Sequence, residues 1–182
     1  MPDWQSGDLV QVTAPADPSQ PREYSIASIP HDGGVHFLVR QHAHPDGSLG
    51  LASGWLTAQA AVGDVVQLRL RQHKRFRLED NAQRPLILIG NGSGIAGLRG
   101  HLKSRVLAGQ RRNWLIFGER NAAHDFHYRE EIEGWHASGD LPRLDLAFSR
   151  DQAERTYVQD RLRGNADEVR LWLEQGAAIY IC

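Results

Sequence analysis

Two separate stretches of this chain carry residue types suited to binding a nucleotide. In the first, Arg22-Glu23-Tyr24-Ser25 lies in an extended stretch, so Arg22 and Tyr24 point one way and Glu23 and Ser25 the other. A guanidinium can hold a phosphate through two hydrogen bonds, and a phenol ring can lie flat against a fused heterocycle. The alternative is a half-buried strand with an exposed arginine and a core tyrosine, and these four residues leave both interpretations open.

The second stretch is a strand that runs into a glycine loop and then a helix. The apolar residues 85–89 lead into Gly90-Asn91-Gly92-Ser93-Gly94, and a helical pattern begins at Ile95. Gly92, Gly94 and Gly97 satisfy G-x-G-x-x-G, whose backbone N–H groups and helix dipole suit a dinucleotide pyrophosphate. Glycine turns between strand and helix are common, but two nucleotide motifs in one chain suggest that something passes between two cofactors.

Two further segments could bind phosphate. Gly50-Leu51-Ala52-Ser53 brings small residues into a predicted helix; the alternative is an ordinary helix capped by Ser53. Ser149-Arg150 comes just past a predicted parallel strand, at the sheet edge where ligands bind. Together with Arg155, Tyr157 and Gln159, these residues suit a 2′-phosphate on an adenosine ribose. The alternative there is a solvated loop whose acids, Asp151 and Glu154, partly neutralise the arginines.

Composition excludes several classes of protein. The 182 residues carry 21 basic and 22 acidic side chains, so no global charge favours nucleic acid or an anionic membrane. The single cysteine, Cys182, excludes an internal disulfide and fits a reducing compartment. Neither a signal peptide nor a bilayer-spanning stretch is evident, so we expect the cytoplasm. The histidines show no metal-ligand spacing, and no metal site is predicted.

The first half of the chain reads as short strands between Pro/Gly turns, which predicts a small antiparallel barrel. The strands are expected near residues 9–12, 24–29, 35–40 and 65–71, with a helix near 54–59. The second half alternates strands and helices, which is typical of βαβ units on a parallel sheet. Its strands are expected near 85–89, 113–118, 144–148 and 177–182, with helices to about 107 and over 128–136, 157–162 and 166–175. Asn165 is expected to cap the last helix with Glu168 as its capping-box partner. We place the domains at 1–82 and 83–182, and both ends of the chain read as cut.

Taken together, these motifs resemble the ferredoxin–NADP reductase superfamily, in particular the reductase half of diflavin enzymes. The resemblance runs in order from the R-x-Y-S flavin motif at Arg22 to the strand that ends in Cys182. It implies a small antiparallel β-barrel FAD domain followed by an α/β Rossmann-like parallel-sheet NADP domain. The chain departs from the family pattern at Gly97, where proline is usual, and at Arg155, where lysine is common.

The resemblance also implies an assignment of residues to two cofactors, FAD and NADPH. Ser25 would lie near the flavin N5 and Cys182 beside the nicotinamide, as the catalytic pair. FAD would be bound by Arg22, Glu23, Tyr24, Ser25, Leu38, Val39, Arg40, Gly50, Leu51, Ala52 and Ser53. NADPH would be bound by Gly92, Ser93, Gly94, Ser149, Arg150, Arg155, Thr156, Tyr157, Val158 and Gln159.

The implied function is transfer of hydride from NADPH to FAD, with electrons passed on to an FMN domain, a haem protein or a small acceptor. Hydride transfer needs the reacting atoms within roughly 3–3.5 Å of each other. One alternative is a non-flavin dehydrogenase, which would need an acid about twenty residues past the glycine loop. Another is a truncated, non-catalytic module for nucleotide binding or partner docking. The sequence does not name the acceptor.

Overall fold

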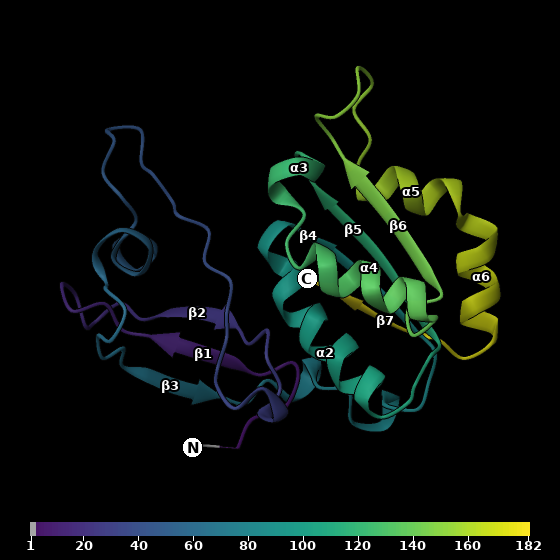
Figure 1. Ribbon diagram of the computed structural model, residues 1–182, viewed down its shortest axis with the longest axis horizontal. Helices are drawn as coiled ribbons and strands as arrows, with labels where there is room; N and C mark the ends of the chain where they lie inside the picture. The colour runs from purple at the N-terminus through teal and green to yellow at the C-terminus, as the bar shows by residue number, and fades with distance from the viewer. Residues whose placement is uncertain (1–2) are drawn as a thin grey trace. The chain divides into compact units, whose positions relative to one another are not determined.

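The computed structural model describes residues 3–182, which form two compact units divided between Arg77 and Leu78 (Figure 1). The sequence predicted the division between residues 82 and 83. The structure assigns the segment before Pro85 to the second unit, because its side chains bind there. Arg84 Nε donates to the Gly176 carbonyl at 2.7 Å, and Asn81 Nδ2 donates to the Tyr180 hydroxyl at 3.0 Å.

The first unit is built on an antiparallel sheet of β1 (Leu9–Val12), β2 (Arg22–Ser25) and β3 (Leu68–Arg71) in the order β2-β1-β3. Val10 and Val12 alternate inward along β1 and pack with Trp4 and Ile26 in a small core. The described strands form an open sheet with two edges, so the antiparallel part of the prediction is confirmed and closure into a barrel is not seen.

The predicted strand at 35–40 is wrong as a regular strand. Phe37 forms a single bridge with Ile26, and Ala43 forms another with Leu49. The residues between these two bridges are largely exposed. They therefore lack the buried cross-strand side-chain contacts that would extend the bridges into a ladder. The helix in this unit is α1 (Leu51–Gly54), which continues as a π-helical turn over Trp55–Gln59; short 3₁₀ turns occupy Pro30–Asp32 and Lys74–Phe76.

A buried ion pair ties the start of the first unit to its end. Asp8 is fully buried, and both of its carboxylate oxygens accept hydrogen bonds from Arg77, at 2.8 and 2.7 Å. The backbone N–H groups of Gln5 and His73 also donate to Asp8. Burial acts to raise the pKa of Asp8, but the hydrogen bonds and the positive charge of Arg77 together lower that pKa below its ordinary value.

The second unit is a parallel sheet covered by helices on both faces (Figure 1). Its strands lie in the order β6-β5-β4-β7, and every pair is parallel. The strands are β4 (Leu86–Asn91), β5 (Asn113–Glu119), β6 (Arg143–Phe148) and β7 (Ala178–Ile181). The helices are α2 (Ile95–Leu107), α3 (Ala122–Asp125), α4 (Arg129–Ser138), α5 (Val158–Gly164) and α6 (Ala166–Glu174), with 3₁₀ turns at Glu79–Asn81 and Gly92–Gly94.

The central strands β4 and β5 are buried on both faces, which is why they read as continuous apolar runs. Ile87, Trp114 and Ile116 pack toward α5 and α6. On the opposite face lie α2 and α4 (Figure 1), where Phe117 stacks on Phe126. The predicted alternation of strands and helices is therefore confirmed. Within residues 3–182, no helix has the length and apolar character needed to cross a bilayer.

Candidate functional site

A hollow of about 550 Å³ in the first unit gathers most of the residues predicted to bind a flavin. Arg22 and Tyr24 reach it from β2, and Arg40 reaches it from the extended stretch that follows Phe37. The predicted phosphate segment contributes Gly50, Leu51, Ala52 and Ser53. Residues about thirty positions apart in sequence, which the family resemblance assigned to one cofactor, therefore line one cavity.

Local hydrogen bonds shape the wall of this hollow. The His42 carbonyl accepts from the Gly50 N–H at 2.8 Å, and the Ser53 hydroxyl accepts from the His42 N–H at 3.1 Å. A side chain at Gly50 would meet Ser53 Oγ at 2.9 Å and His42 Cβ at 3.2 Å. A larger residue at position 50 would make Ser53 and His42 shift, so glycine favours the close approach of these two segments. Ser53 binds the neighbouring segment, so the alternative in which it caps the helix is wrong; the helix begins after Gly50 without a side-chain cap.

The hollow has a mixed electrostatic character. Arg22 and Arg40 are exposed cations, while Tyr24 is half-buried, with its ring centroid 5.4 Å from that of Phe37. Burial raises the pKa of the Tyr24 phenol, and the charge of Arg22 opposes that change only in part, so the ring stays neutral. The one carboxylate of the lining, Asp17, accepts hydrogen bonds from Ser19 and Gln20, and these bonds lower its pKa.

Four residues predicted to bind flavin do not line the hollow. Glu23 forms an ion pair with Arg71 and accepts from Gln11 Nε2 at 3.0 Å, as its opposite direction along β2 requires. Ser25 is half-buried on β2, and its hydroxyl makes no hydrogen bond within the described residues. Leu38 and Val39 are half-buried just before Arg40.

The hollow also includes residues that the sequence interpretation missed, namely Asp17, Gln20, His42 and His44. The two histidines had been considered only as metal ligands. A usable signal was present: Arg40, His42 and His44 alternate with spacing two, which places their side chains on one side of an extended chain. The imidazole rings meet edge-on, with centroids 4.8 Å apart.

In the second unit, the glycine loop lies directly against Cys182. The Cys182 N–H donates to the Ile89 carbonyl at 2.9 Å, and the Asn91 N–H donates to the Cys182 carbonyl at 3.2 Å. A Cβ at Gly94 would lie 2.5 Å from the backbone of Cys182, so glycine is required here for the loop to approach the last strand. The exposed thiol of Cys182 therefore lies beside the loop predicted to bind pyrophosphate.

The predicted 2′-phosphate residues lie at the same carboxyl edge of the sheet. The Ser149 N–H donates to the Glu119 carbonyl at 2.9 Å, and the Arg150 N–H donates to the Arg120 carbonyl at 2.8 Å. These bonds continue the β5–β6 pairing past the end of β6. The side chains of Arg150 and Arg155 are exposed and form no ion pair with any residue in the range 3–182. They are therefore available to an external anion.

Comparison with known families decides the class of this unit. Residues 88–182 match the family described as the oxidoreductase NAD-binding domain, which is slightly more than half of the chain. The chain belongs to this family. The match begins inside β4 and covers the glycine loop, the Ser149-Arg150 segment and Cys182, so it includes every element of the second candidate site.

Curated relatives of this NAD-binding chain extend the similarity to the first unit. The sulfite reductase (NADPH) flavoprotein alpha-component of Mannheimia succiniciproducens is 38% identical over 171 residues, which cover 91% of this chain and 29% of the relative. The proteins of the same name from Vibrio vulnificus and Yersinia enterocolitica are each 39% identical, over 89% and 94% of this chain and 27% and 30% of the relatives. The chain thus spans less than a third of their length. The predicted ferredoxin–NADP reductase superfamily is confirmed.

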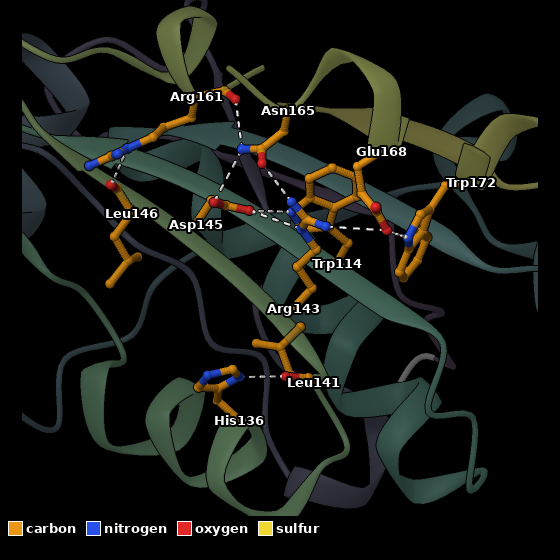
Figure 2. Close-up of polar contacts among 10 residues, drawn as sticks. All are labelled: Trp114, His136, Leu141, Arg143, Asp145, Leu146, Arg161, Asn165, Glu168 and Trp172. Atoms are coloured by element: carbon orange, nitrogen blue, oxygen red, sulfur yellow. Dashed lines mark hydrogen bonds and ion pairs between the residues drawn. The ribbon is translucent and has the colours of Figure 1, made fainter. Parts of the chain in front are cut away.

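A polar network holds α5 and α6 of the NAD-binding domain onto the sheet (Figure 2). Asp145 on β6 accepts from Trp114 Nε1 at 2.7 Å, and the Arg143 guanidinium lies 4.0 Å from the Trp114 ring centroid. Arg143 also donates to Asn165 Oδ1 at 2.6 Å and pairs with Glu168 at 3.2 Å. The predicted capping box is therefore wrong, because Asn165 and Glu168 bind Arg143 instead of each other's backbone.

This network fixes the start of α5, where the last predicted cofactor residues lie. The Arg161 side chain donates to the Leu146 carbonyl at 2.9 Å, and the Tyr157 N–H donates to Asp160 at 2.9 Å (Figure 2 shows the first contact). Tyr157 and Gln159 are exposed and Thr156 is half-buried. Val158 is buried in the core, where a Cβ on Gly118 would meet it at 2.5 Å, so its side chain packs within the protein.

Proposed function

We propose that this chain is a flavoprotein oxidoreductase module that transfers hydride from NADPH to bound FAD and passes electrons to a downstream acceptor. The family match supports an oxidoreductase that binds a nicotinamide nucleotide. The relatives are named as NADPH-dependent sulfite reductase flavoproteins, which favours NADPH as the donor and a flavin as the second cofactor. The antiparallel unit would then be part of the flavin domain, and the parallel unit the nicotinamide domain.

The observation that carries the flavin proposal is the shared hollow around Tyr24. Its lining combines two arginines, the phenol ring of Tyr24 and the segment Gly50–Ser53. Cations can bind a pyrophosphate and the phenol ring can stack on a flat heterocycle, so this combination suits a pyrophosphate joined to a flat ring. A second hollow of about 330 Å³ shares Gly50 and Leu51 with the first and adds Trp55. The two together offer room along the chain for an extended dinucleotide.

The residues of the first unit would then have distinct tasks. Tyr24 would present its ring to the flavin, and Arg22 and Arg40 would balance the charge of the pyrophosphate. Gly50, Leu51, Ala52 and Ser53 would leave space for it. We retain Ser25 as the residue nearest the flavin N5, with Glu23, Leu38 and Val39 supporting the binding strands from outside the hollow.

The residues of the second unit would hold NADPH at the carboxyl edge of the sheet. Gly92, Ser93 and Gly94 would receive the pyrophosphate, and Cys182 would pack beside the nicotinamide. The 2′-phosphate and adenine would be held by Ser149, Arg150, Arg155, Thr156, Tyr157 and Gln159, with Val158 anchoring that segment in the core. The flavin, when bound, supplies the redox chemistry; the protein supplies orientation and charge.

The acceptor we propose is an FMN domain, a haem protein or a small molecule. The near-neutral charge of the chain gives no support for nucleic acid as a partner. We propose the cytoplasm as the compartment, where a lone cysteine stays reduced.

Flavin titration of the 182-residue chain tests the first half of the proposal. FAD is added while its fluorescence is followed, with the wild type, Tyr24→Ala and Tyr24→Phe. We expect Tyr24→Ala to weaken FAD by about tenfold or more through loss of ring stacking, while Tyr24→Phe binds nearly as the wild type does. Arg22→Ala should also weaken FAD, whereas Arg69→Ala, an exposed arginine of β3 outside the hollow, should not.

Equal FAD affinity in the wild type and Tyr24→Ala would refute the flavin assignment. A chain that binds NADPH but no flavin would instead support the non-catalytic nucleotide-binding alternative. The nicotinamide half is tested with Arg150→Glu, which should weaken NADPH far more than NADH. Equal effects on the two nucleotides would remove the 2′-phosphate assignment.

A further inference from the structure

The loop after β6 contains an acid at a position where an acid would be expected to harm phosphate binding. Asp151 directly follows Ser149-Arg150, the pair to which the proposed function assigns the 2′-phosphate of NADPH. A free carboxylate this close would repel the phosphate and neutralise the arginines. The sequence-based alternative, in which Asp151 partly neutralises the arginines, follows from this repulsion.

The structure directs the carboxylate elsewhere. One oxygen of Asp151 accepts from the Ala122 N–H at 2.8 Å, and the other accepts from Asn121 Nδ2 at 3.0 Å. Both partners follow β5, at the start of α3: Asn121 precedes this helix and Ala122 is its first residue. Within residues 3–182, Asp151 forms no ion pair with Arg150 or Arg155. The hydrogen bonds from Ala122 and then Asn121 lower the pKa of Asp151, so the group stays ionised and bound at neutral pH.

These two hydrogen bonds are the last contacts that bind the loop after β6 to another segment before α5 begins. The backbone pairing of Ser149 and Arg150 with the segment after β5 ends at Arg150. From Gln152 to Arg155, the described chain is exposed and makes no hydrogen bond or ion pair. Asp151 is therefore the last residue of this loop that is bound to another segment, and it directly precedes the exposed stretch from Gln152 to Arg155.

We propose that Asp151 is a positioning residue for the 2′-phosphate site: it fastens the Ser149-Arg150 turn to Asn121 and Ala122 and directs its own charge away from the phosphate. This inference rests on the proposed NADPH function. Its consequence is that Asp151 strengthens discrimination for the 2′-phosphorylated nucleotide. The two interpretations of Asp151, repulsion and positioning, predict opposite signs when the carboxylate is removed.

The test is nucleotide binding by the 182-residue chain, measured calorimetrically with 2′,5′-ADP and 5′-AMP as probes. We expect Asp151→Ala to weaken 2′,5′-ADP by roughly three- to tenfold, as loss of charge-assisted hydrogen bonds would, and to leave 5′-AMP within about twofold. Glu154→Ala is the matched control, because it removes an acid of the same loop that has no partner within the described residues. We expect it to leave 2′,5′-ADP binding unchanged or slightly tighter.

Two further variants keep the test decisive if Asp151→Ala unfolds. Asp151→Asn keeps an oxygen for the Ala122 N–H, so it should lose only part of the 2′,5′-ADP affinity. Asn121→Ala removes the other hydrogen bond and leaves the loop charge intact, and it should show the same selective loss. Thermal unfolding of each variant, followed by circular dichroism, confirms that the second unit is folded.

The outcomes separate this inference from the function on which it rests. Asp151 variants that bind 2′,5′-ADP as well as the wild type, or more tightly, overturn the positioning role. If Arg150→Ala loses the preference for 2′,5′-ADP while the Asp151 and Asn121 variants keep it, only the positioning role fails. If the wild type shows no preference for 2′,5′-ADP over 5′-AMP, the proposed NADPH site fails and the inference fails with it.

Discussion

The two units of this chain position their candidate sites by different means. In the second unit, the site lies at the ends of strands β4, β5 and β6. The strands β4 and β5 are buried and have a parallel neighbour on each side, and β6 is the edge strand that pairs with β5. In the first unit, the site lies on β2 and on an exposed stretch that has only single bridges to its neighbours. One site is fixed by a large apolar core, and the other by local hydrogen bonds and glycines.

The small core of the first unit makes its polar contacts more important. Among the described residues, that core has four buried side chains with half-buried apolar side chains packed around them, so the Asp8–Arg77 pair has a large share in holding the first and last segments of the unit together. The parallel unit also buries charge, since Arg105 is almost fully buried and burial lowers its pKa to about 10. There, however, the arginine is bound by the Ala82 carbonyl and by Asn113, against a continuous apolar background.

The largest difference between the units should follow from breaking the Asp8–Arg77 pair. Arg77→Ala leaves a fully buried carboxylate without its main partner, which should cost about 3–5 kcal/mol and unfold the first unit selectively. Hydrogen exchange measured by mass spectrometry should show lost protection in β1 and β3 and unchanged protection in β4 and β5. Arg69→Ala, an exposed arginine on β3, is the matched control and should change neither. Loss of protection in both units would show that the Asp8–Arg77 pair does not stabilise the first unit selectively.

The reverse experiment removes a buried side chain from the parallel sheet. Ile116→Ala on β5 leaves a cavity in a fully buried position and should destabilise the second unit by about 2–5 kcal/mol. Urea unfolding followed by hydrogen exchange should show the loss there, with β1 and β2 unaffected. Leu171→Ala on α6 serves as the control, because its side chain is 45% exposed. A cost for Ile116→Ala no larger than that for Leu171→Ala would show that β5 is not the structural centre of this unit.

A smaller effect is expected from the network that fastens α5 and α6. Arg143→Leu removes contacts with Asn165, Glu168 and the Trp114 ring, and should cost roughly 1–3 kcal/mol. Because α5 begins at the proposed adenine segment, the same variant should also weaken NADPH. Arg170→Leu, on the exposed side of α6, provides the comparison. Unchanged stability and unchanged NADPH affinity in Arg143→Leu would assign the network no role.

The smallest effect near neutral pH concerns Asp8. Its pKa in the folded protein is lowered, so its contribution to stability is fully present above the ordinary aspartate pKa of about 3.9 and is lost as pH falls through the lowered value. Unfolding of the first unit should therefore change little with Asp8 between pH 7 and pH 5, and become strongly pH-dependent below about pH 4. Asp8→Asn should flatten that acid dependence. An identical pH profile in this variant would show that other carboxylates dominate.

Several elements could be predicted because a local sequence pattern is enough to determine them. The strand at Leu9–Val12 follows from alternation, and the order of strand, glycine loop and helix around Gly92 follows from apolar runs and glycine placement. The capping box at Asn165 could not be predicted correctly. Its two side chains bind Arg143, which is distant in sequence and became their partner only when β6 packed beside α6. The strand at 35–40 failed for a related reason, because pairing needs a neighbour that the local pattern cannot supply.

In the candidate sites, too, some features could be predicted from local sequence and others depend on tertiary contacts. By itself, the sequence determined which residue types were present and in what order: Arg22 with Tyr24, the glycines of residues 90–94, and Ser149 with Arg150. Only the tertiary structure decided that Arg40 and two histidines join Tyr24 around one hollow, that Gly94 must be bare to admit Cys182, and that Asp151 turns toward Ala122. The physical reason is that spacing sets the direction of a side chain along its own segment, whereas its partners come from other segments that packing brings within hydrogen-bond distance.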